Sequence, residues 1–170
     1  YILYAGSNDP FADCRESAIA GAGDIGGPFT LVDTTGATVT DKEVITQPSL
    51  VYFGYTFCPD VCPLDNARNA EAVDILEEKG MDVQPAFITI DPARDTPEAM
   101  KIYVSNFHPR LVGLTGSDAD ISAVAKAYRV YYKKSGDSAD YLMDHSSIIY
   151  LMDPDGRFVK HFTYTTDAGA

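Results

Sequence analysis

The sequence predicts an α/β fold, a sandwich in which helices flank a mixed central β-sheet. Strand-like and helix-like patterns alternate through the body of the chain, and one of the strands is a near-continuous apolar run. Such alternation is typical of parallel strands joined by crossover helices, whereas a tight turn near the C-terminus is typical of an antiparallel hairpin. We therefore expect a sheet that is parallel in its first half and antiparallel in its second.

The length of 170 residues suits one folded domain. Residues 1–27, with many Gly and Ala, predict a loosely structured N-terminal extension, and residues 28–170 predict the domain itself. The chain begins at Tyr1, so we expect this extension to follow a removed anchor or signal segment. The formal net charge of −12 argues against a nucleic-acid partner, because phosphate binding needs clustered Lys and Arg.

Strand patterns open the domain. Residues 29–33 and 38–40 predict two short strands, and residues 50–55 form the apolar run expected of a central strand covered on both faces. A helix should follow, with Pro63 in its first turn and Gly80 just after its end. The face of this helix that is expected to be buried comprises Leu64, Ala67, Ala72, Ile75 and Leu76.

Two further strand–helix units have clear helix caps. Residues 83–90 predict the strand of the first unit, Thr96 is the expected N-cap of its helix, and Pro97 suits the first helical position. Residues 111–115 predict the strand of the second unit, whose helix Ser117 should cap. The stripes expected to face the core are Met100, Tyr103, Val104 and Phe107 in one helix and Ile121, Val124, Ala125 and Tyr128 in the other.

The C-terminal part predicts a β-hairpin. Its strands are expected at residues 147–152 and 158–163, joined by an Asp-Pro-Asp-Gly turn at residues 153–156. This hairpin supplies the antiparallel half of the predicted sheet.

Two cysteines four positions apart, Cys58 and Cys62, lie between the apolar strand and the following helix. Paired thiols at such a junction form a disulfide or bind a soft metal, and the positive end of a helix favours the thiolate that both reactions need. The alternative is that two buried cysteines pack as small hydrophobic residues. Three cysteines are too few for a disulfide-built scaffold, and Cys14 is left without an assigned role.

The position and spacing of the dithiol narrow its chemistry. A dithiol at the end of the first strand–helix unit is typical of a thioredoxin-like arrangement. Thioredoxin-type oxidoreductases, however, have two residues between the cysteines, and here three residues, Pro59, Asp60 and Val61, intervene. Peroxide-reducing thiol enzymes of this fold have Thr three positions before the reactive cysteine, where this chain has Tyr55. Both common enzymatic interpretations are therefore weakened.

His145, just before the strand expected at residues 147–152, is the candidate third ligand. In a thioredoxin-like sheet, loops before late strands can reach the first strand–helix turn. Two thiolates and one imidazole suit Cu(I), and a further donor would accommodate Cu(II), whereas a structural zinc site would need a fourth protein ligand. Taken alone, a histidine before a strand is more often a structural or surface residue. His108 and His161 have no such context, and we expect both at the surface.

Asp91 and Arg94 follow the strand expected at residues 83–90, so they could lie at the same end of the sheet as the dithiol. The simpler interpretation is a strand-to-helix turn in which Thr96 caps the helix. A role of Asp91 or Arg94 in tuning a metal or in contacting a partner is the open alternative.

Three segments match one protein family in order and separation. They are Gly-Tyr-Thr-Phe-Cys-Pro-Asp-Val-Cys-Pro at 54–63, Asp-Pro-Ala-Arg-Asp-Thr-Pro at 91–97 and Asp-His-Ser-Ser at 144–147. In these segments the chain resembles the Sco/SenC family, the membrane-tethered, thioredoxin-like copper proteins of cytochrome oxidase assembly. The resemblance runs over about residues 27–162, with one local departure at Phe57, where many members have a polar residue or histidine.

The resemblance implies that Cys58, Cys62 and His145 bind copper, as Cu(I) or Cu(II). It implies a metallochaperone for the dinuclear copper site of cytochrome c oxidase, in which oxidation to the disulfide releases copper because both anionic ligands are lost. The expected partners are the copper-bearing subunit of the oxidase and, in addition, other copper chaperones or thiol reductants.

The expected location is the periplasmic side of the inner membrane or the mitochondrial intermembrane space, behind an N-terminal membrane anchor. Two alternative functions stay open. One is a thiol–disulfide reductase of the oxidase's copper-ligand cysteines, and the other is a redox or copper sensor. We do not expect an enzyme unless the reductase interpretation holds.

Overall fold

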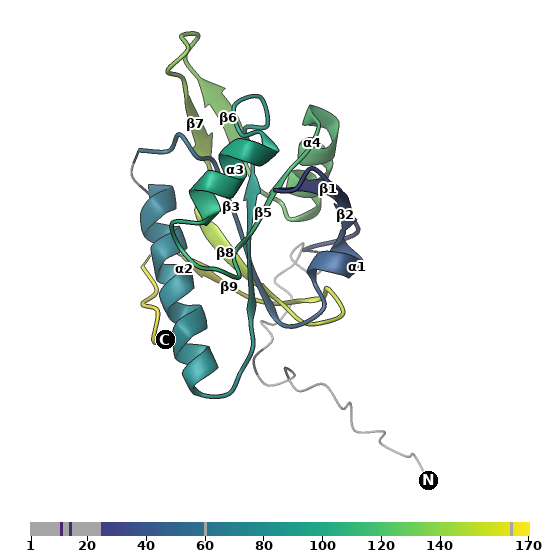
Figure 1. Ribbon diagram of the computed structural model, residues 1–170, viewed down its shortest axis with the longest axis vertical. Helices are drawn as coiled ribbons and strands as arrows, with labels where there is room; N and C mark the ends of the chain where they lie inside the picture. The colour runs from purple at the N-terminus through teal and green to yellow at the C-terminus, as the bar shows by residue number, and fades with distance from the viewer. Residues whose placement is uncertain (1–10, 12–13, 15–24, 60, 164) are drawn as a thin grey trace.

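The computed structural model describes residues 11, 14, 25–59, 61–163 and 165–170. Most of the expected N-terminal extension lies outside these residues, so the boundary between extension and domain stays a prediction. A seven-stranded mixed sheet has the strand order β2-β1-β5-β4-β3-β8-β9, with helices packed against it (Figure 1). The predicted α/β class with a mixed central sheet is confirmed.

Three parallel strands form the centre of the sheet. They are β3 (Ser49–Gly54), β4 (Gln84–Thr89) and β5 (Val112–Thr115). All six residues of β3 are buried, as expected of a strand covered on both faces. Because parallel strands end at the same edge, the segments that follow β3 and β4 leave the sheet side by side.

Antiparallel strands flank this centre on both sides. On one side β1 (Thr30–Asp33) pairs with β2 (Thr38–Thr40) and with β5. On the other side β8 (Ile148–Met152) pairs with β3, and β9 (Phe158–Thr163) pairs with β8 as the predicted hairpin. The parallel part is thus central and not N-terminal, because β1 pairs with a strand far along the chain, which local sequence patterns do not encode.

Four helices accompany the sheet in the described residues: α1 (Asp41–Val44), α2 (Val61–Glu78), α3 (Pro97–Val104) and α4 (Asp118–Ala127). Neighbouring side chains of β3 point to opposite faces. The Tyr52 hydroxyl donates a hydrogen bond to Asp65 of α2, whereas the Phe53 ring contacts Tyr128 at the end of α4. Helices α2 and α3 therefore share one face of the sheet, and α4 covers the other (Figure 1).

The predicted caps of α3 and α4 are confirmed. The Thr96 hydroxyl accepts a hydrogen bond from the backbone N–H of Ala99, and the Ser117 hydroxyl accepts one from Asp120. Each bond satisfies an amide that the first turn of a helix leaves without a partner. Helix α3 ends at Val104, so Phe107, the last residue of its predicted stripe, packs from beyond the helix.

The buried face predicted for α2 is wrong at Leu64 and Ala67, which are exposed, whereas Ala72, Ile75 and Leu76 are half-buried and Leu76 packs against the core. Leu64 is 63% exposed, and the face that is buried consists of Cys62, Asp65, Asn66, Asn69, Ala70 and Val73. The helix turns Cys62 fully inward, and at 3.6 residues per turn a residue two positions later points about 200° away. Polar side chains on the buried face are matched by polar groups opposite them, such as the Asn66 amide that donates to the Tyr103 hydroxyl at 3.2 Å.

Two features were not predicted from the sequence. Helix α1 is only four residues long, too short to give a periodic pattern. Strands β6 (Tyr132–Ser135) and β7 (Leu142–His145) form a separate two-stranded sheet that projects beyond the main sheet (Figure 1). Three of the four residues of β6 are exposed and polar, so this strand has no apolar alternation to detect.

The two remaining histidines are not simple surface residues. His108 is buried, with an exposed fraction of 8%, so the expectation of a surface position is wrong. Its Nε2 lies 3.0 Å from Asp74 Oδ1, and its Nδ1 accepts a hydrogen bond from the backbone N–H of Arg110. Both ring nitrogens thus have partners that offset burial. His161 is partly buried on β9, opposite Tyr150 of β8.

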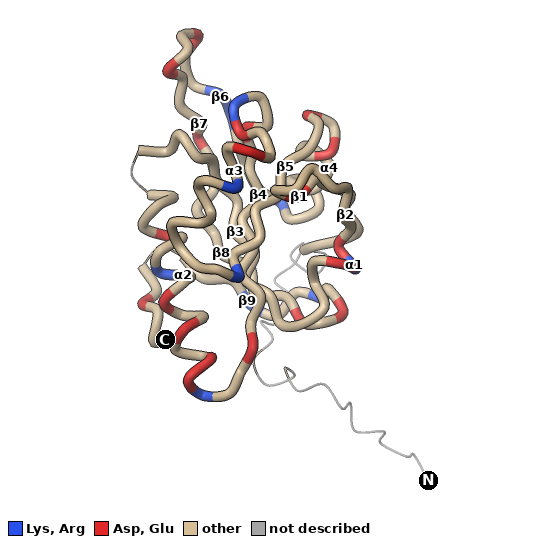
Figure 2. Tube along the Cα trace, in the orientation of Figure 1, with Lys and Arg blue, Asp and Glu red and all other residues tan. Residues whose placement is uncertain are grey.

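The described surface is acidic in several places. Asp and Glu lie on α1, α2 and α4 and at the tip of the β6–β7 hairpin, rather than on one element (Figure 2). Among the described residues, every helix is too short or too polar to cross a bilayer.

Candidate metal centre

The three predicted metal ligands lie together in space. Cys58 is in the loop after β3, Cys62 is in the first turn of α2, and His145 is the last residue of β7. The two sulfur atoms and an imidazole nitrogen lie within 4.8 Å of one another, and Cys62 Sγ is 3.2 Å from His145 Nε2. The segment before the late strand β8 therefore does reach the turn between β3 and α2, although His145 lies on strand β7 of a hairpin and not in a loop.

Gly54, the last residue of β3, makes room for the buried sulfur. A Cβ atom at this position would lie 2.8 Å from Cys62 Sγ and 3.0 Å from the Phe87 ring. Distances this short are not sustained by real side chains, and the nearby atoms belong to packed groups. The absence of a side chain at Gly54 thus lets Cys62 lie directly against the end of the strand.

The start of α2 ties the two cysteines together. The backbone N–H of Cys62 donates a hydrogen bond to Cys58 Sγ at 3.3 Å. Amides in the first helical turn have no intrahelical acceptor, and their partial positive charge stabilises an anionic sulfur. The helix begins at Val61, so Pro63 lies in its first turn as predicted, and Cys62 belongs to the same turn.

Hydrogen bonding and burial keep the second thiol protonated. The hydrogen bond with Cys58 and the burial of the side chain raise the pKa of Cys62 far above its usual range. Cys62 is therefore a neutral thiol near neutral pH when no metal is bound. A metal ion that binds the thiolate has to displace this proton, so metal affinity at the site depends on pH.

The imidazole of His145 is oriented for ligation. Its Nδ1 lies 2.9 Å from the Ser146 carbonyl oxygen, and donation to that oxygen leaves Nε2 directed at Cys62. Burial lowers the pKa of His145, but hydrogen bonds with Cys58 and with the Ser146 carbonyl outweigh it, so the pKa is raised overall. The ring also packs edge-on against Tyr55, with centroids 5.8 Å apart.

A buried polar pair lies behind Cys62. The Tyr52 hydroxyl donates to Asp65 at 2.7 Å, and Arg68 Nη1 lies 2.9 Å from the other carboxylate oxygen. Burial, together with the negative charges near it, raises the pKa of Tyr52 far above its usual range, so this hydroxyl stays protonated and keeps donating. Sequence reasoning missed these residues, because Asp65 and Arg68 look like the exposed face of a helix.

The front of the site is open. A hollow of about 360 Å³ is lined by Tyr55, Cys58, Val61, Leu142 and His145. Cys58 reaches this hollow, whereas Cys62 is fully buried behind it. A metal ion or a thiol that approaches from outside therefore meets Cys58 and His145 first.

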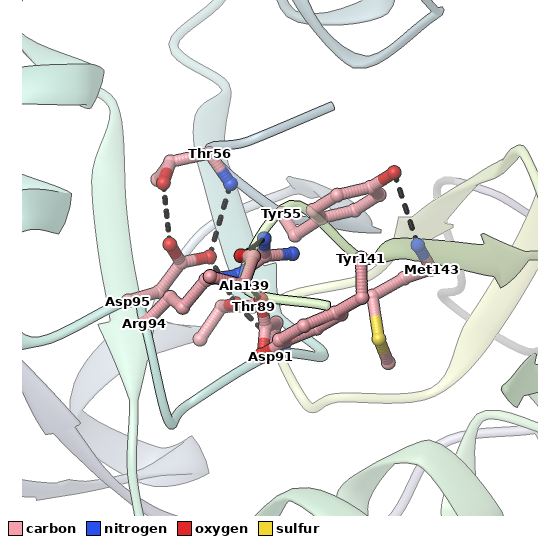
Figure 3. A network of polar contacts seen from close by, with 9 residues as sticks. All are labelled: Tyr55, Thr56, Thr89, Asp91, Arg94, Asp95, Ala139, Tyr141 and Met143. Atoms are coloured by element: carbon pink, nitrogen blue, oxygen red, sulfur yellow. Dashed lines mark hydrogen bonds and ion pairs between the residues drawn. The ribbon is translucent and has the colours of Figure 1, made fainter. Parts of the chain in front are cut away.

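Asp91 and Arg94 lie at the dithiol end of the sheet, as the sequence suggested (Figure 3). Arg94 Nε is 2.6 Å from Asp91 Oδ2, and the other Asp91 oxygen accepts a hydrogen bond from the Tyr141 hydroxyl at 2.6 Å. The simpler interpretation also holds in part, because the same turn does end in the Thr96 cap.

Cys14 is an exposed free thiol.

The donor set suits a soft metal of low coordination number. In the part of the chain that the structure describes, the cluster holds two thiols and one imidazole and no fourth His, Cys, Asp or Glu. Soft thiolates with an imidazole favour copper, whereas a closed structural zinc site takes four protein ligands.

The fold and site together define a class of protein: a thioredoxin-like α/β domain with a CxxxC dithiol at the junction of β3 and α2, and a histidine from a distant part of the sequence beside it. The chain belongs to the SCO1/SenC family, whose family model matches residues 17–170. It is 53% identical over 156 residues to Protein SenC of Rhodobacter capsulatus, an alignment that covers 91% of this chain and 70% of that protein. It is 47% identical over 150 residues to the mitochondrial Protein SCO1 homolog 1 of Arabidopsis thaliana, where the alignment covers 87% of this chain and 45% of that protein.

Solved structures agree with this assignment. The crystal structure of Arabidopsis thaliana ScoI with copper bound has a TM-score of 0.82 and 47% identity, and the match covers 85% of this chain and 91% of that one. BsSco, described as a member of the Sco family of cytochrome c oxidase assembly proteins with a disulfide switch, has a TM-score of 0.67 and 28% identity, with 81% and 82% covered. The predicted family and the thioredoxin-like fold are confirmed.

Proposed function

We propose that this protein binds copper through the thiolates of Cys58 and Cys62 and through Nε2 of His145. The observation that supports it most is the convergence of these three donor atoms, from three separate segments, to within 4.8 Å of one another. The copper-bound structure of the Arabidopsis relative supports copper as the metal. Copper is the cargo of the site in this proposal.

The dithiol gates copper binding through its oxidation state. A partner disulfide oxidises Cys58 and Cys62 by thiol–disulfide exchange: their two thiol protons and two electrons leave, one S–S bond forms here, and the partner's S–S bond becomes two thiols. The disulfide no longer offers two anionic sulfurs, so copper is left with His145 alone and dissociates.

The biological role that fits is delivery of copper to the dinuclear copper site of cytochrome c oxidase. The description of BsSco as belonging to a family of cytochrome c oxidase assembly proteins supports this role. The partner is then the copper-bearing subunit of the oxidase, with other copper chaperones or thiol reductants acting before it. The bacterial and mitochondrial relatives support a periplasmic or intermembrane-space location. The membrane anchor in this proposal rests on the family resemblance alone.

A second candidate function is reduction of the oxidase's copper-ligand cysteines. The position of Cys58 at the hollow, with Cys62 buried next to it, supports this alternative. Cys58 would attack a partner disulfide, and Cys62 would then resolve the mixed disulfide. Both functions start from the same reduced pair of cysteines and end with the disulfide, but only copper delivery carries a metal.

Anaerobic copper titration of the reduced protein tests the proposal. We expect one copper per chain and a thiolate-to-copper charge-transfer absorption for bound Cu(II). Cys58→Ser, Cys62→Ser and prior oxidation should each abolish the absorption, and His145→Ala should weaken binding. His161→Ala, a change to a histidine on β9, is the matched control and should behave like the unchanged protein. Binding that is insensitive to all three ligand substitutions would exclude this site.

Reduction of an oxidised peptide that carries the oxidase's two ligand cysteines tests the alternative. A reductase should transfer its electrons rapidly and stoichiometrically to the peptide in the absence of copper. A reaction no faster than that of a free dithiol reagent would exclude the reductase function.

A further inference from the structure

The hairpin that carries His145 is not part of the main sheet. Strands β6 and β7 pair only with each other among the described strands. Both cysteines, in contrast, lie at the junction of the central strand β3 and helix α2. The cysteines follow β3 directly, and His145 is linked to the main sheet through β8, which begins at Ile148. How closely the hairpin itself lies against the Cys58 loop depends in addition on contacts of its own residues.

Alternate residues of the hairpin face the body of the protein. Met143 and His145 are partly buried, whereas Leu142 and Asp144 are exposed, and Tyr141 continues the inward series. The backbone N–H of Met143 donates a hydrogen bond to the Tyr55 hydroxyl at 3.1 Å (Figure 3). On this one face of the hairpin, Tyr141 binds Asp91, the Met143 amide binds Tyr55, and His145 lies against Cys62.

Arg94 touches both of the segments that carry ligands. Its guanidinium carbon lies 3.6 Å from the ring centroid of Tyr141 and 4.4 Å from that of Phe57. Tyr141 is on the hairpin, four positions before His145, and Phe57 directly precedes Cys58. Arg94, on the loop between β4 and α3, therefore contacts both the hairpin and the Cys58 loop.

Polar contacts hold Arg94 in this position. Asp91 binds Arg94 Nε and also accepts from the Tyr141 hydroxyl, and Arg94 Nη1 lies 3.5 Å from the Ala139 carbonyl oxygen. Arg94 Nη2 is buried and has no hydrogen-bond acceptor among the described residues, so the aromatic rings are what that end of the guanidinium meets.

The loop that carries Arg94 is itself fixed to the start of the site. The Asp95 carboxylate accepts hydrogen bonds from the Thr56 backbone N–H at 3.0 Å and from the Thr89 hydroxyl at 2.6 Å (Figure 3). Thr56 lies two residues before Cys58. Arg94 therefore projects toward the hairpin from a loop that is bound to the Cys58 segment.

We propose that Arg94 is a positioning residue that holds His145 within reach of the two cysteines by joining the hairpin to the Cys58 loop. This inference rests on the proposed function, because it assigns His145 a role as ligand. The relevant property of Arg94 is its flat guanidinium, which stacks on Tyr141 while it binds Asp91. Lysine has the charge but not the flat surface, so it cannot do both.

The test compares Arg94→Lys with Arg110→Lys. Arg110 is also partly buried and ion-paired, with Glu77, but it precedes β5 and so lies at the opposite end of the parallel strands. In the copper titration we expect Arg94→Lys to weaken binding about 10- to 100-fold, the range seen when the support of a metal-ligating histidine is removed. The nitrogen hyperfine coupling of His145 in the Cu(II) spectrum should decrease, while the thiolate absorption persists. Arg110→Lys should change neither.

A second measurement uses the metal-free reduced protein. NMR signals of the His145 ring should broaden or move toward free imidazole in Arg94→Lys, and the Met143 amide should exchange faster with solvent. Tyr141→Leu removes the stacking partner from the hairpin side and should have the same effects. If Arg94→Lys does not fold, Tyr141→Leu decides the question alone.

Wild-type values in the folded variants, for both the His145 ring signals and copper affinity, would overturn the inference. If the unchanged protein binds no copper, the proposed function fails, and the NMR comparison still decides whether Arg94 places His145. The two ideas can therefore fail separately.

Discussion

Cys58 and Cys62 differ in their access to solvent although they belong to one site. Cys58 is 8% exposed and lines the hollow, whereas Cys62 is 0% exposed and has its pKa raised by the hydrogen bond with Cys58 and by burial. Alkylating reagents attack the accessible thiolate and not a buried thiol. External thiols, reagents and metal ions can thus reach the sulfur of Cys58 directly, whereas Cys62 can react only after the site opens or through Cys58.

We expect iodoacetamide to modify Cys58 at least about tenfold faster than Cys62 in the reduced, metal-free protein, because exposure and thiolate character both favour it. Peptide mass spectrometry of a time course measures the two rates. Cys14→Ser is the suitable background, since Cys14 is exposed and would otherwise react as well. Equal rates at Cys58 and Cys62 would contradict this order of access.

At the scale of elements, the rotation of α2 about its own axis decides which of its side chains are buried behind the site. We expect Leu64→Gln, at a position that is 63% exposed, to change the free energy of unfolding by less than about 0.5 kcal/mol. Val73→Ala removes two buried methyl groups from a fully buried side chain and should cost about 2 kcal/mol.

Urea unfolding monitored by circular dichroism measures both α2 variants. The sequence pattern, which assigns Leu64 to the core, predicts the opposite order of effects. A large loss of unfolding free energy for Leu64→Gln and none for Val73→Ala would show that α2 is rotated about its axis, with Leu64 buried and Val73 exposed.

The turn between β1 and β2 depends on one carboxylate. Asp33 accepts hydrogen bonds from the Thr35 hydroxyl and from the backbone N–H groups of Thr35 and Ala37. The Thr35 hydroxyl contributes most, burial opposes it, and the two backbone N–H groups add to it, so that the pKa of Asp33 is lowered overall. The stabilisation is therefore complete above the unfolded pKa of about 3.9 and is lost as the pH falls through the lower folded value.

We expect Asp33→Ala to lower the free energy of unfolding by about 1 kcal/mol at pH 7, in line with the loss of local hydrogen bonds. The difference from the unchanged protein should shrink when both are measured by urea unfolding at pH 3. Asp33→Asn, which has an acceptor but no charge, is the control. The difference in the free energy of unfolding between Asp33→Asn and Asp33→Ala should change little between pH 7 and pH 3. A difference between Asp33→Ala and the unchanged protein that is the same at both pH values would rule out a contribution from the ionised carboxylate.

Elements with a strong local signal were predicted from the sequence, and those that depend on distant partners were not. The caps at Thr96 and Ser117 and the apolar run of β3 are local patterns, and each was found where expected. The face of α2 was wrong in part because the buried Asp65 carboxylate and Asn66 amide nitrogen bind tyrosines of other elements. Hairpin β6–β7 was missed because its strands hardly contribute to the core.

The sequence predicts the three side chains that come together at the candidate site, but not the contacts that surround them. Cys58 and Cys62 stand out by spacing, and His145 by the motif around it. Tyr55 was noted only as a mismatch to a peroxide-reducing enzyme, yet its hydroxyl accepts the Met143 amide and its ring packs on His145. Contacts of this kind join residues far apart in the chain, and one sequence does not reveal them.

For the whole molecule, copper binding and folding are coupled. A ligand that binds only the folded state stabilises it by about 2.7 kcal/mol at a free concentration 100 times its Kd. For a chain of this size that corresponds to a rise in Tm of about 5–10 °C.

Calorimetry of the reduced protein with and without copper under anaerobic conditions measures this shift. We expect the full rise for the unchanged protein, a smaller one for His145→Ala and none for the disulfide form, because that form has lost both sulfur ligands. An equal rise in the oxidised protein would place the stabilising copper elsewhere.

The enclosure of Cys62 behind Cys58 also limits chemical damage. Peroxide that enters the hollow reaches Cys58 and converts its thiolate to a sulfenic acid. The neighbouring Cys62 sulfur, within 4.8 Å, then attacks this group, so that the disulfide forms and water leaves. Further oxygenation to the irreversible sulfinic and sulfonic acids is intercepted, and a thiol reductant restores both cysteines. We therefore expect peroxide treatment of the reduced protein to give the Cys58–Cys62 disulfide, the copper-free state of the proposed function, and mass spectrometry that finds sulfinic acid at Cys58 instead would contradict this.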